Sequence, residues 1–397
     1  MKRLILIFIT VLVSVLFIDV DALELNINSN NAVLYNLKDN TVLYEKNSDE
    51  KVSIASLTKI MTAIVAIENI DNLDETVVIK KADFDGIAEA NLATAGFKIG
   101  DKVTYRDLLY GLLFPSGAEA AQALANNISS SNEEFVKLMN KKKDELKLKN
   151  THFANTTGLD NENHYSTVKD VATIFKYALK NKEFLKIITT KTYQVSNGSF
   201  SLKSPVTKHN LGMNYLLGGK TGTTGDAGLC LATIAKQDDA YLMLVTVKAP
   251  YTKSKPLAYL DAKTVYDYFF DNYSYHEVVN KDDVVLKLKT LYTKDDIVKF
   301  KANKSIKLYL KNNYNKKDIK YKYKGTKIVT YKMKKGEKLG VLNIYYKNKK
   351  VNSFNVVLNQ NQTLSIPKYL LGHKLIVIAV LVVFIGLLIL LKCKSKR

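Results

Sequence analysis

The spacing of hydrophobic and polar positions changes several times along this chain, and each change predicts a different kind of element. Residues 32–37 and 41–45 are mostly apolar and lie on either side of the turn pair Asp39-Asn40, which predicts a β-hairpin. Apolar side chains then recur at helical spacing in a series of segments. These helical segments begin at residue 56 and continue through residues 105–113, 117–124, 135–146 and 168–179.

Strand patterns return before residue 275. Residues 229–234 and 241–247 are apolar runs joined across Gln237-Asp238-Asp239, and residues 262–270 predict one more helix. Strands at both ends of a helical middle are typical of an α/β (α+β) sandwich, in which helices cover a mainly antiparallel sheet. We therefore expect one such domain over residues 23–275, with its first and last strands side by side.

The pattern changes again at residue 276, where lysine begins to alternate with Val, Ile, Leu and Tyr. This period of two, clear at residues 319–323, predicts a separate all-β accessory domain over residues 276–360. Residues 276–359 hold 22 lysines, no arginine and seven acidic residues, so this segment carries +15 of the chain's net charge of +21. A solvated strand face is one interpretation of these lysines.

A charged surface of this kind can also indicate a binding partner. No nucleic-acid recognition motif accompanies the lysines, so we expect no nucleic acid as partner. An anionic membrane surface or anionic wall polymers would be attracted to the same charge.

The N-terminal segment is typical of a targeting signal. Lys2 and Arg3 precede an apolar stretch at residues 4–18, and small residues follow at Val20-Asp21-Ala22. This order predicts a secretory signal peptide over residues 1–22. An uncleaved membrane helix is the alternative, although the stretch is short for a span.

The C-terminal segment predicts a membrane anchor. Residues 375–391 form an uninterrupted apolar run of 17 residues, near the lower limit for a transmembrane helix. Residues 361–374 would be a linker, and the basic residues 392–397 a cytoplasmic tail. We therefore expect a single C-terminal span in the cell membrane, with the body of the protein extracytoplasmic.

A Ser-x-x-Lys spacing occurs four times, beginning at Ser48, Ser56, Ser166 and Ser365, but only Ser56 opens a strongly apolar helix. The match at Ser365 contains Pro367, which disfavours a regular helix. Positions i and i+3 share a helix face, so Lys59 can reach the Ser56 hydroxyl. Burial would lower the pKa of Lys59, which could then take the proton as Ser56 attacks. Helix capping is the alternative role for Ser56.

Two later segments contain side chains that could assist Ser56 and Lys59 in catalysis or substrate binding. Ser116 precedes a helix and could relay a proton, or simply cap that helix. Lys220-Thr221-Gly222-Thr223 lies in the glycine-rich residues 218–225, which predict a strand edge that a peptide could join, with Lys220 binding a carboxylate. A glycine-rich turn is the alternative. A phosphate-binding loop does not fit, because the glycine that begins that motif is missing.

Together these segments resemble the active site of the serine-type D-alanyl-D-alanine carboxypeptidases, the low-molecular-mass penicillin-binding proteins. The similarity covers residues 25–275 and extends more weakly to residue 359. It also includes sequences outside the three motifs, at residues 54–62, 135–140, 153–159, 227–232 and 335–340.

The resemblance implies a penicillin-binding, β-lactamase-like transpeptidase fold and a mechanism. Ser56 would be the nucleophile, Lys59 the general base and Ser116 a proton relay, while Lys220, Thr221, Gly222 and Thr223 would bind substrate. The backbone N–H groups of Ser56 and Thr223 would form the oxyanion hole. The enzyme would remove the terminal D-alanine from peptidoglycan stem peptides, and β-lactam antibiotics would inhibit it covalently. A D,D-endopeptidase and a catalytically weak wall-binding homologue are the alternatives.

Two departures from the family pattern bear on turnover. Ala118 stands where members usually have asparagine, and no arginine lies between Arg106 and Arg397 to hold a terminal carboxylate. Thr221 and Lys220, with Lys253 or Lys255, would have to hold that carboxylate instead. Losing one such contact typically costs ~10²–10³ in rate, so we expect acylation of Ser56 with weaker or altered turnover. The histidines are scattered and no nucleotide motif is present, so we expect no metal and no cofactor.

Overall fold

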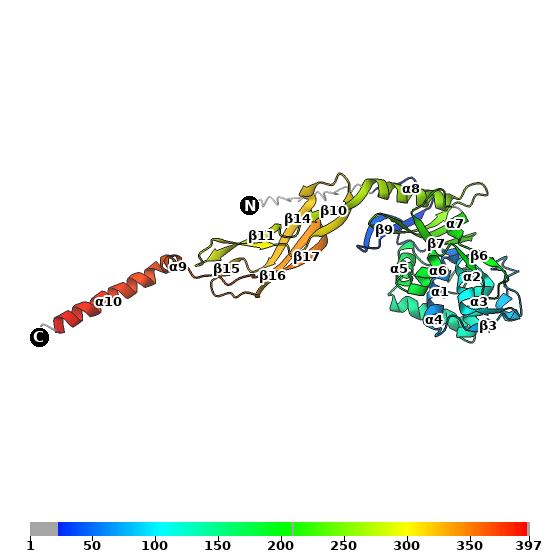
Figure 1. Ribbon diagram of the computed structural model, residues 1–397, viewed down its shortest axis with the longest axis horizontal. Helices are drawn as coiled ribbons and strands as arrows, with labels where there is room; N and C mark the ends of the chain where they lie inside the picture. The colour runs from blue at the N-terminus through cyan, green and yellow to red at the C-terminus, as the bar shows by residue number, and fades with distance from the viewer. Residues whose placement is uncertain (1–22, 209, 395–397) are drawn as a thin grey trace, which may run out of the picture. The chain divides into compact units, whose positions relative to one another are not determined.

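The computed structural model describes residues 23–208 and 210–394, which form two compact units (Figure 1). The first unit ends at Asp271 and the second begins at Asn272, close to the start predicted for the accessory domain. The predicted signal peptide, residues 1–22, lies outside the described residues.

A five-stranded antiparallel sheet forms the centre of the first unit. Its strand order is β2-β1-β9-β8-β7, so the first strands of the unit pair with the last, as the sequence predicts. The strand β7 lies at one edge of the sheet. The bounds are β1 (Asn31–Asn36), β2 (Thr41–Lys46), β7 (Leu216–Thr224), β8 (Gly228–Gln237) and β9 (Ala240–Ala249).

Helices cover both faces of this sheet, which confirms the predicted α/β sandwich (Figure 1). Every residue of α1 from Thr58 to Ala66 is buried, as expected for a helix that is apolar all round. On the other face, α8 (Leu257–Asn272) places the Tyr266 hydroxyl 3.1 Å from the Leu244 amide, which donates to it. The other helices are α1 (Thr58–Glu68), α2 (Tyr105–Leu113), α3 (Ala118–Ile128), α4 (Asn132–Glu145), α5 (Val168–Ala178), α6 (Lys182–Thr189) and the short α7 (Pro205–Lys208).

Short strands and 3-10 helices complete the first unit. They are η1 (Ala55–Leu57), β3 (Thr76–Val78), η2 (Lys81–Phe84), β4 (Lys102–Thr104), β5 (Thr192–Gln194) and β6 (Ser201–Lys203). The strands β3 and β4 pair with each other, as do β5 and β6.

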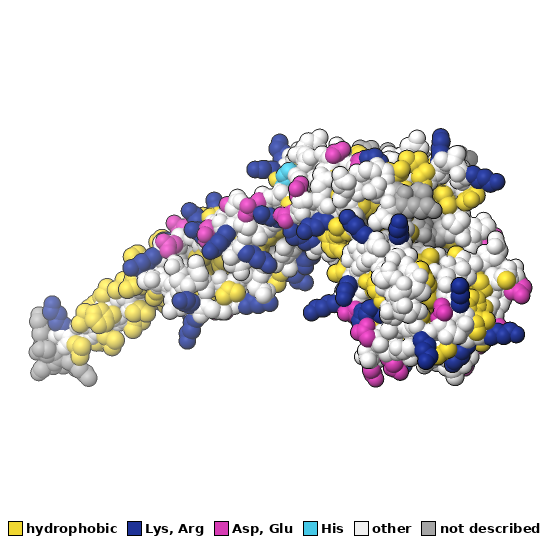
Figure 2. Space-filling model, turned by 45° about the vertical axis from the view of Figure 1, so that its right-hand side comes forward, with side chains coloured by type: hydrophobic (Ala, Val, Ile, Leu, Met, Phe, Trp, Pro, Cys, Tyr) yellow, Lys and Arg dark blue, Asp and Glu magenta, His cyan; other side chains and the backbone are white. Residues whose placement is uncertain are grey.

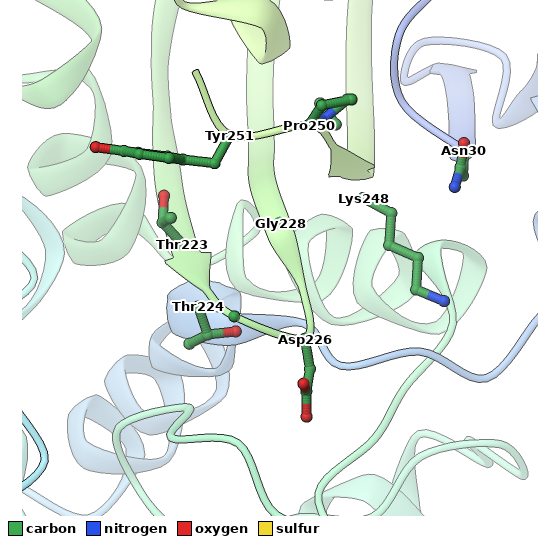
Figure 3. Close-up of a pocket in the computed structure, with 10 residues that line it drawn as sticks. Asn30, Thr223, Thr224, Asp226, Gly228, Lys248, Pro250 and Tyr251 are labelled. Atoms are coloured by element: carbon green, nitrogen blue, oxygen red, sulfur yellow. The ribbon is translucent and has the colours of Figure 1, made fainter. Parts of the chain in front are cut away.

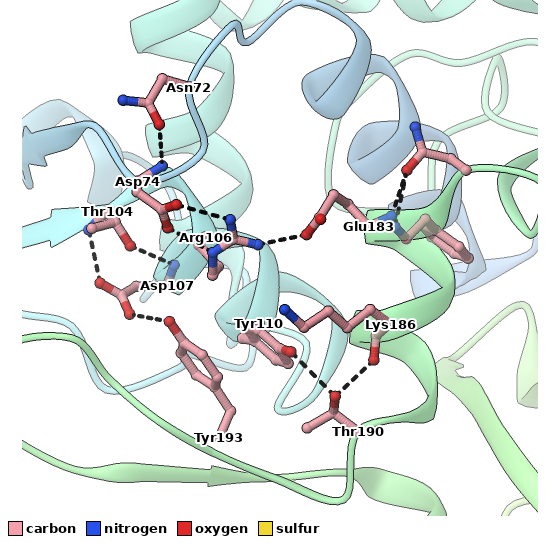
Figure 4. A network of polar contacts seen from close by, with 12 residues as sticks. Asn72, Asp74, Thr104, Arg106, Asp107, Tyr110, Glu183, Lys186, Thr190 and Tyr193 are labelled. Carbon is pink, nitrogen blue, oxygen red and sulfur yellow. Dashed lines mark hydrogen bonds and ion pairs between the residues drawn. The ribbon is translucent and has the colours of Figure 1, made fainter.

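Arg106 in the first turn of α2 connects two distant segments (Figure 4). Its guanidinium donates to both carboxylate oxygens of Asp74, at 2.7 and 3.1 Å, and to Glu183 at 2.6 Å. Glu183 lies in the first turn of α6. Paired, planar contacts of this kind fix orientation as well as distance. Arg106 therefore connects α6 to the segment that contains Asp74.

The second unit is built from strands, which confirms the predicted all-β accessory domain. Its sheets have the orders β10-β13, β12-β11-β15 and β14-β16-β17 around a core that includes Val329 and Ile344. The bounds are β10 (Tyr273–Val279), β11 (Val284–Leu291), β12 (Ile297–Lys301), β13 (Ile306–Lys311), β14 (Ile319–Gly325), β15 (Ile328–Thr330), β16 (Lys338–Tyr346) and β17 (Lys349–Val357), with η3 (Lys316–Asp318) before β14.

Two helices follow these strands. The segment predicted as a linker contains α9 (Ile366–Gly372), so the expectation that Pro367 prevents a helix is wrong. Pro367 occupies the first turn, where its missing N–H would have no helical partner in any case. The following α10 (Lys374–Lys394) contains a candidate membrane span over Lys374–Lys392, with a mean hydropathy of 3.2 and exposed apolar side chains (Figure 2).

Candidate active site

Ser56 lies in the tight turn η1, directly before α1. Two glycines allow other backbone segments to approach this turn closely. A Cβ atom added to Gly158 would lie 2.0 Å from the Ala55 carbonyl oxygen, and one added to Gly222 would lie 3.0 Å from the Ser56 amide nitrogen. Gly222 belongs to β7, so the Ser56 N–H lies against this edge strand.

The Ser56 hydroxyl is paired with a buried lysine. The Lys59 ammonium donates to Ser56 Oγ at 3.1 Å and to the Thr157 carbonyl oxygen at 2.8 Å. The capping alternative for Ser56 is not realised, because α1 has Leu57 at its N-cap and no side-chain cap. Burial lowers the pKa of Lys59 to about 7, although the negative charge of Glu119 acts in the opposite direction. Lys59 can therefore accept a proton near neutral pH.

A second serine–lysine pair lies beside the first. Lys220 donates to Ser116 Oγ at 3.0 Å and to the Thr221 carbonyl oxygen at 2.8 Å. Burial, and then the nearby charge of Lys59, keep the pKa of Lys220 well below its usual value. Ser116 has a positive φ of 68°, and the N-cap of α3 is Gly117 without a side-chain cap. The Ser116 hydroxyl is thus directed to Lys220 and does not cap the helix.

The other predicted binding residues lie on the open edge of the sheet. Thr221 and Gly222 follow Lys220 on β7, and Thr223 is exposed, with its hydroxyl donating to the Gly222 carbonyl oxygen at 2.8 Å. The structure therefore brings together all seven residues that the sequence proposed. By contrast, Lys253 and Lys255 are exposed residues of the loop after β9.

Ala118 is fully buried, and its neighbour Glu119 is a buried carboxylate that the motifs did not indicate. Glu119 Oε1 accepts from the amides of Ala95 and Gly96, at 2.6 and 3.0 Å, while Oε2 has no partner among the described residues. Burial raises the pKa of Glu119, and the backbone hydrogen bonds oppose this shift. Glu119 therefore fixes the loop at residues 95–96 beside the second motif.

His164 contacts the first residue of α1, the helix that follows Ser56, and the sequence analysis did not single it out. Its Nδ1 accepts a hydrogen bond from the Ala154 amide at 3.1 Å, so the ring hydrogen lies on Nε2. Nε2 then donates to Thr58 Oγ1 at 2.7 Å. Burial lowers the pKa of His164 to about 4, which keeps the ring neutral. A single histidine far along the chain gave no sequence signal for this contact.

A surface pocket opens beside Thr223, where β7, β8 and β9 end or begin (Figure 3). Its lining comes from segments that are distant in the sequence, namely Asn30, residues 223–226, Gly228 and residues 248–251. Asn30, Asp226 and residues 248–251 belonged to no segment that the sequence analysis had singled out. Among the described residues, no group of three or more His, Cys, Asp or Glu side chains has the arrangement of a metal site.

Comparison with known proteins gives matches over both units. A family model described as D-alanyl-D-alanine carboxypeptidase matches residues 19–251, and one described as penicillin-binding protein 5, C-terminal domain, matches residues 273–363. The D-alanyl-D-alanine carboxypeptidase DacF of Bacillus subtilis is 32% identical over 325 residues, which cover 80% of this chain and 82% of that protein.

Solved structures show the same fold. The Streptomyces K15 DD-transpeptidase has a TM-score of 0.58 at 33% identity, covering 63% of this chain and 99% of that one. Penicillin binding protein 5 from Haemophilus influenzae has a TM-score of 0.66 at 24% identity, covering 85% of this chain and 98% of that one. The similarity to the Haemophilus influenzae protein is a similarity of fold, and it extends into the accessory domain.

Proposed function

Because this chain belongs to the family of D-alanyl-D-alanine carboxypeptidases, we propose that it removes the terminal D-alanine of peptidoglycan stem peptides through an acyl-enzyme on Ser56. The observation that carries this assignment is the Ser56–Lys59 hydrogen bond of 3.1 Å. A serine hydroxyl is a weak nucleophile until a base takes its proton, and an ordinary lysine is protonated at neutral pH. Lys59, with a pKa of about 7, is available as that base.

In the first step, Ser56 Oγ attacks the carbonyl carbon of the penultimate D-alanine while Lys59 takes the hydroxyl proton. Negative charge then develops on the carbonyl oxygen. The N–H groups of Ser56 and Thr223 would stabilise this charge, and the close approach of Gly222 to the Ser56 amide supports their placement on one oxyanion.

In the second step, the bond to the terminal D-alanine breaks and its amine leaves with a proton. Ser116 would deliver that proton, because its hydroxyl accepts a hydrogen bond from Lys220 and is free to donate its own hydrogen. The proton that Lys59 took from Ser56 would pass to Ser116 through Lys220, so that Lys59 is neutral again. Lys220 and Thr221 would hold the terminal carboxylate. Water would then hydrolyse the ester on Ser56, with Lys59 again acting as base. β-Lactams would acylate Ser56 in the same way.

We also propose that α10 anchors the protein in the cell membrane, with the catalytic unit on the wall side. The apolar span at Lys374–Lys392 supports this placement, and a secretory signal at residues 1–22 would deliver the body across the membrane. The lysine-rich accessory domain would then face anionic lipid headgroups or anionic wall polymers.

The test is release of D-alanine by the detergent-solubilised full chain from a pentapeptide ending in D-Ala-D-Ala, beside a cross-linked stem-peptide dimer. We expect faster release from the pentapeptide, and none after Ser56→Ala. Faster cleavage of the dimer would instead favour a D,D-endopeptidase. Penicillin labelling of Ser56 without cleavage of either substrate would favour a catalytically weak wall-binding protein.

A further inference from the structure

One sheet of the accessory domain exposes a row of lysines on its outer face. The strands β11 and β12 alternate between buried apolar residues, which belong to the core of the domain, and exposed lysines. Because successive side chains of a strand point to opposite faces, these lysines share the solvent face of the sheet. Lysine side chains are prominent along this domain in Figure 2. We call the following four residues the lysine stripe: Lys287, Lys289, Lys299 and Lys301.

The register of the two strands brings like charges together within the lysine stripe. Lys287 lies directly opposite Lys299 in the antiparallel pair, and Lys289 and Lys301 lie on either side of them along the strands. Residues directly opposite on one face have Cβ atoms about 5 Å apart, and like charges in that position destabilise a sheet. The accessory domain therefore keeps a cross-strand pairing that costs it folding stability.

No carboxylate compensates for this repulsion. Among the described residues, none of the four lysines of the stripe forms an ion pair. The acidic residues next to these strands have other partners, since Asp296 pairs with Lys368 at 2.8 Å and Asp283 accepts from the Asn280 amide at 2.7 Å. The lysine stripe is therefore a surface of one sign of charge, which attracts anions.

The lysine stripe extends along the strands, away from the helices that precede and form the candidate span. The strand β11 ends next to Tyr292, whose ring contacts that of Tyr369 in α9 with centroids 5.3 Å apart. Lys289 is close to this end, whereas Lys301 pairs with Val284, which lies about 26 Å from Tyr292 at 3.3 Å per residue. Surface charge is screened over about 8 Å at physiological salt. A bilayer at the start of α10 would therefore act on the near end of the stripe, while a linear polymer can follow its whole length.

We propose that the lysine stripe binds a linear polyanion of the cell wall, one with a negative charge on each repeat, such as a polyol phosphate. Alternate residues of a strand are about 7 Å apart, so successive charges of an extended polymer can meet successive lysines. Each such contact releases condensed counterions, which favours a linear polyanion over separate anions. Bound polymer also relieves the repulsion between Lys287 and Lys299. This inference rests on the proposed function only in that it places the accessory domain on the wall side of the membrane.

The test measures binding of fluorescent poly(glycerol phosphate) to the full chain in nanodiscs of neutral lipid. Lys287→Met should weaken binding about fivefold, the usual effect of one lysine at an anionic surface. It should also lower the slope of log Kd against log salt by about 0.7. Lys287→Glu should weaken binding further and yet raise the thermal midpoint, because the new carboxylate lies opposite Lys299. A purely structural role for Lys287 would instead lower binding and stability together.

Matched controls are Lys349→Met and Lys349→Glu, which change the net charge equally on β17, in a different sheet. Both should keep the wild-type Kd. An equal loss of binding in these controls would assign binding to net charge and overturn the inference, as would a wild-type chain that does not bind the polymer. D-alanine release, measured on the same preparations, should be unchanged in every variant. It tests the proposed function separately, so that either claim can fail alone.

Acetylation of lysine side chains, located by mass spectrometry, distinguishes the polymer from the membrane as the partner. In neutral nanodiscs, added poly(glycerol phosphate) should protect all four lysines of the stripe. Anionic lipid without polymer should protect Lys289 at most. Protection of the whole stripe by anionic lipid alone would overturn the inference and assign the stripe to the membrane surface.

Discussion

Lys59 and Lys220 are both buried, and each donates to a serine hydroxyl. Burial lowers the pKa of both ammonium groups, and their mutual repulsion adds to the shift at Lys220. Glu119 is the buried carboxylate that opposes this effect at Lys59. The protonation of Lys59 is therefore set by desolvation against one nearby negative charge.

The first prediction concerns the pH dependence of acylation. Lys59 acts as a base only when neutral, so the acylation rate with penicillin should rise with pH and reach half its plateau near pH 7. Glu119→Gln removes the charge that raises the Lys59 pKa, and should move this midpoint to lower pH. The control Glu89→Gln changes an exposed carboxylate and should leave the midpoint unchanged. A midpoint near pH 10 in the wild type would contradict a role for Lys59 as base.

The second prediction distinguishes a proton-relay role of Ser116 from a helix-capping role. Because Ser116 does not cap α3, Ser116→Ala should leave the thermal midpoint nearly unchanged. It should lower kcat for D-alanine release about 10²- to 10⁴-fold, the usual contribution of a positioned proton donor. Calorimetry and peptide kinetics on one preparation provide both readings. A large loss of stability with little loss of kcat would assign Ser116 a structural role instead.

At the scale of elements, the position of Ser56 depends on three segments that meet. The turn η1 carries the serine, β7 brings Gly222 against its amide, and the segment at Gly158 lies against Ala55. Gly158 also has a positive φ of 87°. Close backbone contact, and not a side-chain interaction, therefore sets the relation between nucleophile and strand edge.

The third prediction is that Gly158→Ala displaces this turn. The added methyl group would overlap the Ala55 carbonyl oxygen, so we expect roughly 1–3 kcal/mol less stability and strongly reduced penicillin acylation. Gly198→Ala is the matched control, because Gly198 has a similar φ of 75° but nothing within 4 Å of the added atom. Its stability should fall by less and its acylation rate should not change. Similar effects of both substitutions on acylation would refute the contact argument.

Local patterns predicted the elements and the Ser56–Lys59 pair, because helical spacing places these two side chains together, and the glycines of residues 218–225 indicated a strand edge. They did not predict Glu119, whose partners Ala95 and Gly96 belong to a distant loop. The surface pocket beside Thr223 was missed for the same reason, since its lining joins segments near residues 30, 226 and 248. Contacts of this kind depend on tertiary folding and leave no periodic signal.

For the whole molecule, the accessory domain and α10 are the two parts that we propose attach it to a surface. Lys320, Lys322 and Lys324 alternate along β14 and so share one face of their sheet. Among the described residues, none of the three lysines forms an ion pair, and Lys322 Nζ lies 4.9 Å from the centre of the Tyr345 ring. The apolar side chains of α10 are exposed by contrast and suit a bilayer.

The fourth prediction distinguishes these two contributions. A chain that ends at residue 373 lacks α10 and should leave the membrane fraction for the soluble one, with penicillin labelling retained. The released protein should still sediment with anionic vesicles at low salt, more than with neutral ones, and lose this binding at about 0.5 M salt through screening. Continued membrane association at high salt would contradict α10 as the anchor. Equal, salt-independent binding to both vesicles would contradict the role of the lysines.

The central claim is that Ser56 forms a covalent acyl-enzyme, and mass spectrometry of the full chain after incubation with benzylpenicillin tests it most directly. The account predicts a mass increase of one penicillin per chain, located by peptide mapping on the segment that contains Ser56, and no increase in Ser56→Ala. An unmodified wild-type chain, or an adduct that persists in Ser56→Ala, would contradict it.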